Sequence, residues 1–101
     1  MLTITAIIRA KKGQEAALRQ ALLDVAENVR DNEPTTIGFF ISQDVLNPGV
    51  FTTYERFVDR AAMDRHNNSD AVARFFAIAK PLLDGEVTLV TSTEISMKPG
   101  T

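Results

Sequence analysis

The sequence predicts a ferredoxin-like α+β fold, in which a four-stranded antiparallel sheet has its helices on one face. Four segments alternate apolar and other residues, as strands do. Two of the intervals between them repeat apolar residues every three or four positions, as helices do. The predicted order is therefore βαββαβ. A chain of 101 residues is the size of one domain, and we expect residues 1–101 to form it, with a loose tail over about 97–101.

The first strand and the first helix are separated by Gly13. Residues 2–9 alternate with period two and predict a strand. Residues 14–31 predict a helix that ends before Pro34, because a proline disfavours helical geometry at the residue preceding it. The apolar stripe of this helix consists of Leu18, Ala21, Leu22, Val25 and Val29.

A hairpin and a second helical region complete the pattern. Strands are predicted at 36–43 and 50–58, joined by a turn at Asn47-Pro48-Gly49. Asp59 can cap a short helix that runs to about residue 66. Ser69 can cap a longer helix with Val72, Phe75, Phe76, Ala79 and Leu83 on one stripe, and Pro81 kinks or ends it. The last strand is predicted at 86–95.

Both faces of the predicted sheet carry large apolar side chains. The second strand has Ile37, Phe39 and Ile41 on one of its faces and Phe40 on the other. The third strand has Phe51 and Phe57 on one of its faces and Tyr54 and Val58 on the other. An antiparallel sheet with one solvated face should alternate cleanly between apolar and polar residues. We therefore expect the second face to pack against another copy of the chain, as a homodimer with two-fold symmetry.

Composition excludes several classes of protein. The chain has no cysteine, which excludes disulfides and thiolate metal sites, and its single histidine excludes a multi-histidine metal site within one subunit. A net charge of -2 without a basic cluster argues against nucleic-acid binding. Every apolar stretch is interrupted by a polar residue, so no membrane span is predicted, and the N-terminus lacks the features of a signal peptide. We expect a cytoplasmic protein.

Two residues are candidates for proton transfer. His66 is the one side chain whose ordinary pKa, about 6.5, allows proton exchange near neutrality, and its alternative role is a helix-end hydrogen bond. Glu55 shares a face with Phe51, Thr53 and Phe57, where a carboxylate is costly unless it is paired or functional. It can orient His66 or bind a substrate hydroxyl, or it can form a structural ion pair with an arginine.

An ordered set of short motifs resembles the antibiotic biosynthesis monooxygenase family, which includes quinol monooxygenases. The set comprises Leu2-Thr3-Ile4, Lys12-Gly13, Gly38, Gln43-Asp44, Asn47-Pro48-Gly49, Phe51, Tyr54-Glu55-Arg56-Phe57, Asp59, Ala62, His66 and Phe75. The resemblance implies a dimeric α/β barrel, in which two sheets face one another and each subunit has an apolar pocket. It also implies oxidation of a small hydroquinone-like aromatic substrate by molecular oxygen, without flavin, haem or metal.

These implications give each candidate residue a role in a quinol or polycyclic phenol monooxygenase that needs no cofactor. His66 would remove the phenolic proton, Glu55 and Thr53 would position the substrate, and the pocket wall would consist of Phe39, Phe51 and Phe57. Phe57 departs from the family, where tryptophan is frequent at this position. Two alternatives stay open: a non-oxidative isomerase or cyclase of a small carbonyl metabolite, and a non-catalytic dimer that binds an aromatic ligand.

Overall fold

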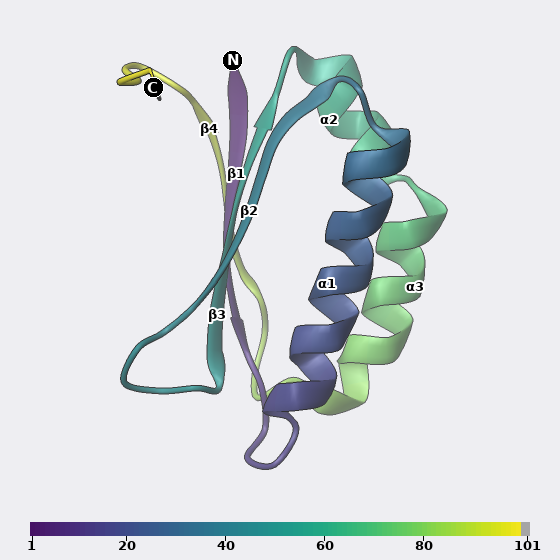
Figure 1. Cartoon of the computed structure of the whole chain (residues 1–101), viewed down its shortest axis with the longest axis vertical. Helices are drawn as coiled ribbons and strands as arrows, with labels where there is room; N and C mark the ends of the chain where they lie inside the picture. Colours follow the sequence, from purple (N-terminus) through teal and green to yellow (C-terminus); the bar gives the residue numbers. More distant parts are fainter. Residues whose placement is uncertain (100–101) are drawn as a thin grey trace.

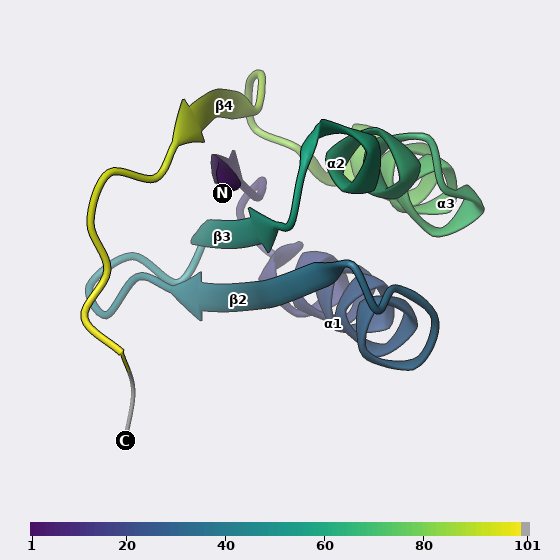
Figure 2. The same cartoon turned by 90° about the horizontal axis from the view of Figure 1, so that it is seen from above.

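The computed structural model describes residues 1–99 and has the ferredoxin-like architecture. Its strands lie in the order β2-β3-β1-β4, and each neighbouring pair is antiparallel. Seen from above, the helices lie on one side of this sheet (Figure 2). The elements are β1 (Leu2–Arg9), α1 (Glu15–Asn32), β2 (Thr36–Gln43), β3 (Val50–Phe57), α2 (Arg60–Asn67), α3 (Asp70–Ala79), the 3-10 turn η1 (Lys80–Leu82) and β4 (Thr88–Thr93) (Figure 1).

The main core lies between the sheet and helices α1 and α3. The five residues of the predicted α1 stripe are all buried, which confirms that the 3.6-residue period identified the inner face of this helix. They pack against Ile8 of β1, Phe51 of β3 and Phe75 of α3. A smaller cluster joins Phe57 at the end of β3 to Ile4 and to Met63 of α2.

Capping residues fix the helices that follow β3. The Asp59 side chain accepts a hydrogen bond from the Ala62 amide, 2.9 Å away, at the start of α2. Ser69 does the same for the Val72 amide at the start of α3, at 3.2 Å. Both caps agree with the prediction, and α3 ends before Pro81, because the chain turns into η1 after Ala79. Two residues expected on the apolar stripe of this helix do not belong to it: Leu83 lies after η1 in extended backbone, and Phe76 is 47% exposed.

Two details of the sheet differ from the prediction. The pairing of β2 with β3 shifts register between Thr36 and Gly38, and Ile37 is 42% exposed rather than facing the core with Phe39 and Ile41. A bulge of this kind adds one residue and interrupts the alternation of faces. The last strand is also shorter than the predicted 86–95, since β4 and its ladder with β1 extend only over Thr88–Thr93.

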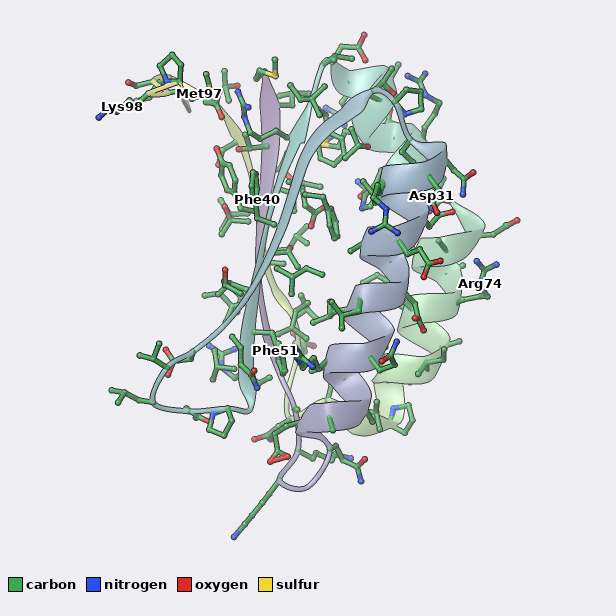
Figure 3. All side chains as sticks on the ribbon, in the orientation of Figure 1. Asp31, Phe40, Phe51, Arg74, Met97 and Lys98 are labelled. Atoms are coloured by element: carbon green, nitrogen blue, oxygen red, sulfur yellow. The ribbon has the colours of Figure 1, made fainter. Side chains whose placement is uncertain are left out.

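The face of the sheet that points away from the helices carries exposed apolar side chains. Phe40, which lies on that side in Figure 3, is 58% exposed, and its ring centroid is 6.4 Å from that of Tyr54. Beside this pair, Glu94 receives hydrogen bonds from Arg56 at 2.8 Å and from the Tyr54 hydroxyl at 2.8 Å. The hydrogen bond from Arg56, and to a smaller extent the one from Tyr54, lowers the pKa of Glu94. These contacts attach the segment after β4 to β3.

Candidate active site

A single cluster of buried polar side chains lies between the sheet and the helices. Period two along β3 points Thr53 and Glu55 toward the helices, and both are buried. The β2–β3 register places Phe39 opposite Glu55. His66, in the last turn of α2, approaches from the helical layer and is 4% exposed.

Both ring nitrogens of His66 face carboxylates. Nδ1 is hydrogen-bonded to Oε1 of Glu33 at 2.8 Å, and Nε2 lies 3.2 Å from Oε1 of Glu55. The imidazole ring also lies between two aromatic rings, with centroids 5.5 Å from Phe39 and 5.5 Å from Phe57. The ring is therefore held from four directions, and neither nitrogen is left for another partner.

This arrangement favours the doubly protonated ring. A neutral imidazole has one N–H donor, so its other nitrogen would turn a lone pair toward a carboxylate oxygen. An imidazolium donates from both nitrogens. Burial lowers the pKa of His66, but the hydrogen bonds to Glu55 and Glu33 and the charges of these two groups outweigh burial, and the net effect raises the pKa.

Each carboxylate in the cluster has further donors. The Thr53 hydroxyl donates to Oε2 of Glu55 at 2.7 Å. Glu33 receives hydrogen bonds from the Thr36 hydroxyl at 2.9 Å and from the Asn28 side-chain amide at 3.0 Å. Within residues 1–99, no buried side-chain nitrogen or oxygen lacks a partner. The cluster is a complete hydrogen-bond network, which is the condition for keeping charged groups inside a protein.

The cluster forms the polar end of a cavity of ≈ 80 Å³ between the sheet and the helices. Its polar lining consists of Thr53, Glu55, His66 and Asn67. Its apolar lining consists of Ile4, Ala6, Ile8, Leu22, Val25, Phe39, Val72, Phe75, Phe76, Val87 and Leu89. Phe76 of α3 and Leu89 of β4 are 47% and 56% exposed, so the cavity opens to solvent between these two elements.

The structure brings most of the candidate residues together. Thr53, Glu55, His66 and Phe39 all line the cavity. Two residues expected in the pocket wall are outside it: Phe57, whose ring centroid is 5.5 Å from that of His66, is not part of the cavity lining, and Phe51 belongs to the core beside α1, where Figure 3 shows it. Period two identifies the face of a strand, but it does not tell how far along the strand a cavity extends.

Sequence reasoning missed Glu33. It was interpreted only as the residue before Pro34 at the end of the first helix, and the structure places it at the C-terminal cap of α1, against His66. The two residues are 33 positions apart. No spacing rule connects a helix end to a side chain on another helix, so no signal in the single sequence could have revealed this contact.

Residues 1–99 contain no group of three histidine, cysteine or acidic side chains arranged to bind a metal ion. None of their helices combines the length and apolar character needed to cross a bilayer.

Comparisons with known proteins agree with the fold. A family model described as "Antibiotic biosynthesis monooxygenase" matches residues 1–78. A crystal structure of an antibiotic biosynthesis monooxygenase superposes with a TM-score of 0.87 at 23% identity, covering 95% of this chain and 100% of that one. A Pseudomonas aeruginosa protein gives 0.85 at 27% identity, covering 94% of each chain.

A Shewanella oneidensis protein gives a TM-score of 0.84 at 27% identity, covering 90% of this chain and 87% of that one. Among curated proteins, none matches. The family model covers well over half of the sequence, which confirms the resemblance drawn from the motifs. The protein belongs to the antibiotic biosynthesis monooxygenase family.

Proposed function

We propose that the protein is a cofactor-independent monooxygenase that oxidises a quinol or a related electron-rich phenol with molecular oxygen. The observation that supports this most directly is the position of Glu55 and His66, an acidic side chain beside an imidazole, at the inner end of an apolar cavity. A phenol placed there would have its hydroxyl beside a proton acceptor and its ring among apolar side chains. Membership of a monooxygenase family supports the same reaction class.

Glu55 is our candidate for the proton acceptor, in place of His66. Both His66 nitrogens already face carboxylates, whereas Glu55 lines the cavity and each of its oxygens has a second lone pair. In the proposed reaction Glu55 takes the phenolic proton, and the adjacent imidazolium of His66 stabilises the negative charge left on the phenolate. Thr53 orients Glu55 through its 2.7 Å hydrogen bond.

The remaining steps need the substrate and oxygen alone. The phenolate gives one electron to oxygen, and the resulting phenoxyl radical and superoxide combine to form a peroxide at a ring carbon that carries hydrogen. Glu55 returns its proton to the terminal peroxide oxygen. The O–O bond then breaks as that carbon loses its hydrogen, which leaves a ring carbonyl and one molecule of water. One oxygen atom thus enters the product and the other becomes water.

The size of the cavity constrains how a substrate can bind. At ≈ 80 Å³ it is smaller than the cavity of about 150 Å³ that accommodates benzene in another protein. A polycyclic phenol would therefore place its hydroxyl-bearing edge inside and extend its other rings past Phe76 and Leu89 at the opening. Movement of these half-exposed side chains would enlarge the site without disturbing the polar cluster.

The small volume of the cavity favours a second candidate function. A small carbonyl metabolite fits a cavity of ≈ 80 Å³ better than a polycyclic ring does, and Glu55 could move a proton between its carbon atoms in a non-oxidative isomerase or cyclase. The two functions differ in their need for oxygen, which makes them experimentally separable.

We also propose that the protein acts as a homodimer through the outer face of its sheet. Phe40, Tyr54 and Val90 are 58%, 38% and 51% exposed on this face, on three different strands. A two-fold axis would place these side chains against their copies and remove them from water. The proposed partner is therefore a second copy of the chain.

Oxygen uptake by metal-stripped protein, with a panel of hydroquinones, naphthohydroquinones and anthrones, tests the proposed function. We expect uptake above autoxidation with at least one substrate, and a loss of about 100-fold or more in kcat/KM in Glu55→Gln. Glu27→Gln, which removes the same charge from an exposed site on α1, should match the wild type. Turnover that persists without oxygen would instead indicate the isomerase or cyclase. Ligand binding with no turnover would indicate a binding module.

A further inference from the structure

Glu33 is a nearly buried carboxylate that the proposed reaction does not use directly. Its side chain is 13% exposed, and it lies at the connection between α1 and β2, away from the cavity lining. Three side chains from three different elements are hydrogen-bonded to it: Asn28 of α1, Thr36 of β2 and His66 of α2. Such convergence fixes the carboxylate in one orientation, with Oε1 directed at Nδ1 of His66.

We propose that Glu33 is a positioning residue, which holds the Nδ1–H of His66 and thereby keeps the ring doubly protonated with Nε2–H directed at Glu55. This inference rests on the proposed function for its catalytic meaning, but the ring's protonation state is a property of the protein alone. Glu33 would touch neither substrate nor oxygen. It would act entirely through His66.

The energetics of the ring explain why a second carboxylate is needed. Burial is the largest influence on His66 and opposes its charge, while Glu33 and Glu55 oppose burial from opposite sides of the ring. Glu33 approaches from the α1–β2 connection and Glu55 from β3. Arg65, the neighbour of His66 on α2, donates instead to the Thr35 hydroxyl at the surface. In the proposed reaction Glu55 becomes neutral when it accepts the phenolic proton. Without Glu33, His66 would then have no charged partner, and the ring would lose its own charge at the step in which the phenolate forms.

Glu33 also lies between the buried ring and water. It lines a surface groove together with Asn28, Thr36, Arg65 and Arg74, on the opposite side of His66 from the cavity. Arg74 points away from the sheet, as Figure 3 shows. The Nδ1 side of the ring therefore communicates with solvent through Glu33, while the Nε2 side faces the cavity. This separation gives the ring a route for its proton that does not pass through the cavity.

NMR of the imidazole tests the proposal, because His66 is the only histidine in the chain and gives one set of ring signals. In long-range 1H–15N spectra of the wild type near neutral pH, both ring nitrogens should have the shifts of an imidazolium. In Glu33→Gln the ring should titrate at lower pH than in the wild type. Glu27→Gln, which removes the same charge from an exposed site on α1, should titrate close to the wild type.

Three results would overturn the proposal. The first is a neutral His66 in the wild type near neutral pH, which can be observed even where the variant fails to fold. The second is a Glu33→Gln titration that superimposes on the wild type, and the third is an equal shift in Glu27→Gln. The experiment needs no substrate, so a failure of the oxygen-uptake assay leaves it interpretable. Where uptake is found, the pH profile of kcat should move in Glu33→Gln together with the ring titration, and an unmoved profile would contradict a positioning role.

Discussion

Thr53→Val isolates one hydrogen bond of the buried cluster. Thr53 is 3% exposed, and its hydroxyl donates at 2.7 Å to Oε2 of Glu55, which is itself 6% exposed. Valine has nearly the same shape and suits a strand, so the change removes the hydroxyl and leaves the packing almost intact. Oε1 of Glu55 still faces His66 in the variant, so one of its two buried contacts is lost.

The expected loss in the free energy of unfolding follows from the type of hydrogen bond that Thr53 makes to Glu55. A hydrogen bond to a charged group contributes about 1.5–3 kcal/mol, and leaving a buried acceptor without a donor puts the cost near the middle of that range. We therefore expect the free energy of unfolding to fall by about 2 kcal/mol. In a domain of this size, that corresponds to a decrease of roughly 8–16 °C in Tm.

Urea unfolding followed by far-UV circular dichroism measures this difference. The matched control is Thr52→Val, one position earlier on β3 and on the opposite face of the sheet, which should change the free energy by less than about 0.5 kcal/mol. Equal m-values in both variants and the wild type would show that the unfolded states are comparable. A loss below about 0.5 kcal/mol in Thr53→Val would refute the reasoning, because Oε2 of Glu55 would then be satisfied equally well without the hydroxyl.

Three further predictions concern stability and assembly. The pKa of His66 is raised in the folded protein, so the contribution of His66 to the free energy of unfolding is complete below the unfolded pKa of about 6.5. That contribution is lost as pH rises through the folded pKa. Urea titrations across this pH window should show the decline in the wild type and a flatter profile in His66→Gln. Phe57→Ala should lower the free energy of unfolding by about 3–5 kcal/mol, since Phe57 is fully buried against Ile4 and Met63, and a cost under about 1 kcal/mol in thermal unfolding would contradict that packing. Phe40→Glu should weaken the proposed dimer by about 30-fold or more in sedimentation velocity, and an unchanged dimer would exclude the outer face as the interface.

Periodicity was sufficient to predict the fold. The α1 stripe, the alternation along β3 and the caps at Asp59 and Ser69 depend on local rules, and the structure confirms each of them. Ile37 shows where such rules end. The bulge beside it depends on how β2 pairs with β3, and pairing between strands is absent from the pattern of either strand alone.

The candidate site could be predicted only in part. Period two placed Thr53 and Glu55 on one face, and the ordinary pKa of histidine made His66 a candidate for proton transfer. The contact between His66 and Glu55 depends on how α2 returns over the sheet, and local spacing does not determine that. The contact with Glu33, on which our proposal of His66 as a cation rather than a base rests, depends on the tertiary fold and required coordinates.

The buried cluster is better explained by function than by stability. Placing charged groups in a protein interior costs several kcal/mol for each ion, and replacing a buried ion pair by apolar residues of similar volume is often neutral or stabilising. Glu55 and His66 are 8% and 4% exposed as side chains, and they border a cavity that apolar residues could otherwise have filled. A fold under selection for stability alone gains little from this arrangement. The proposed reaction needs both groups at that position, because Glu55 would accept the proton of the substrate and a protonated His66 would stabilise the resulting anion.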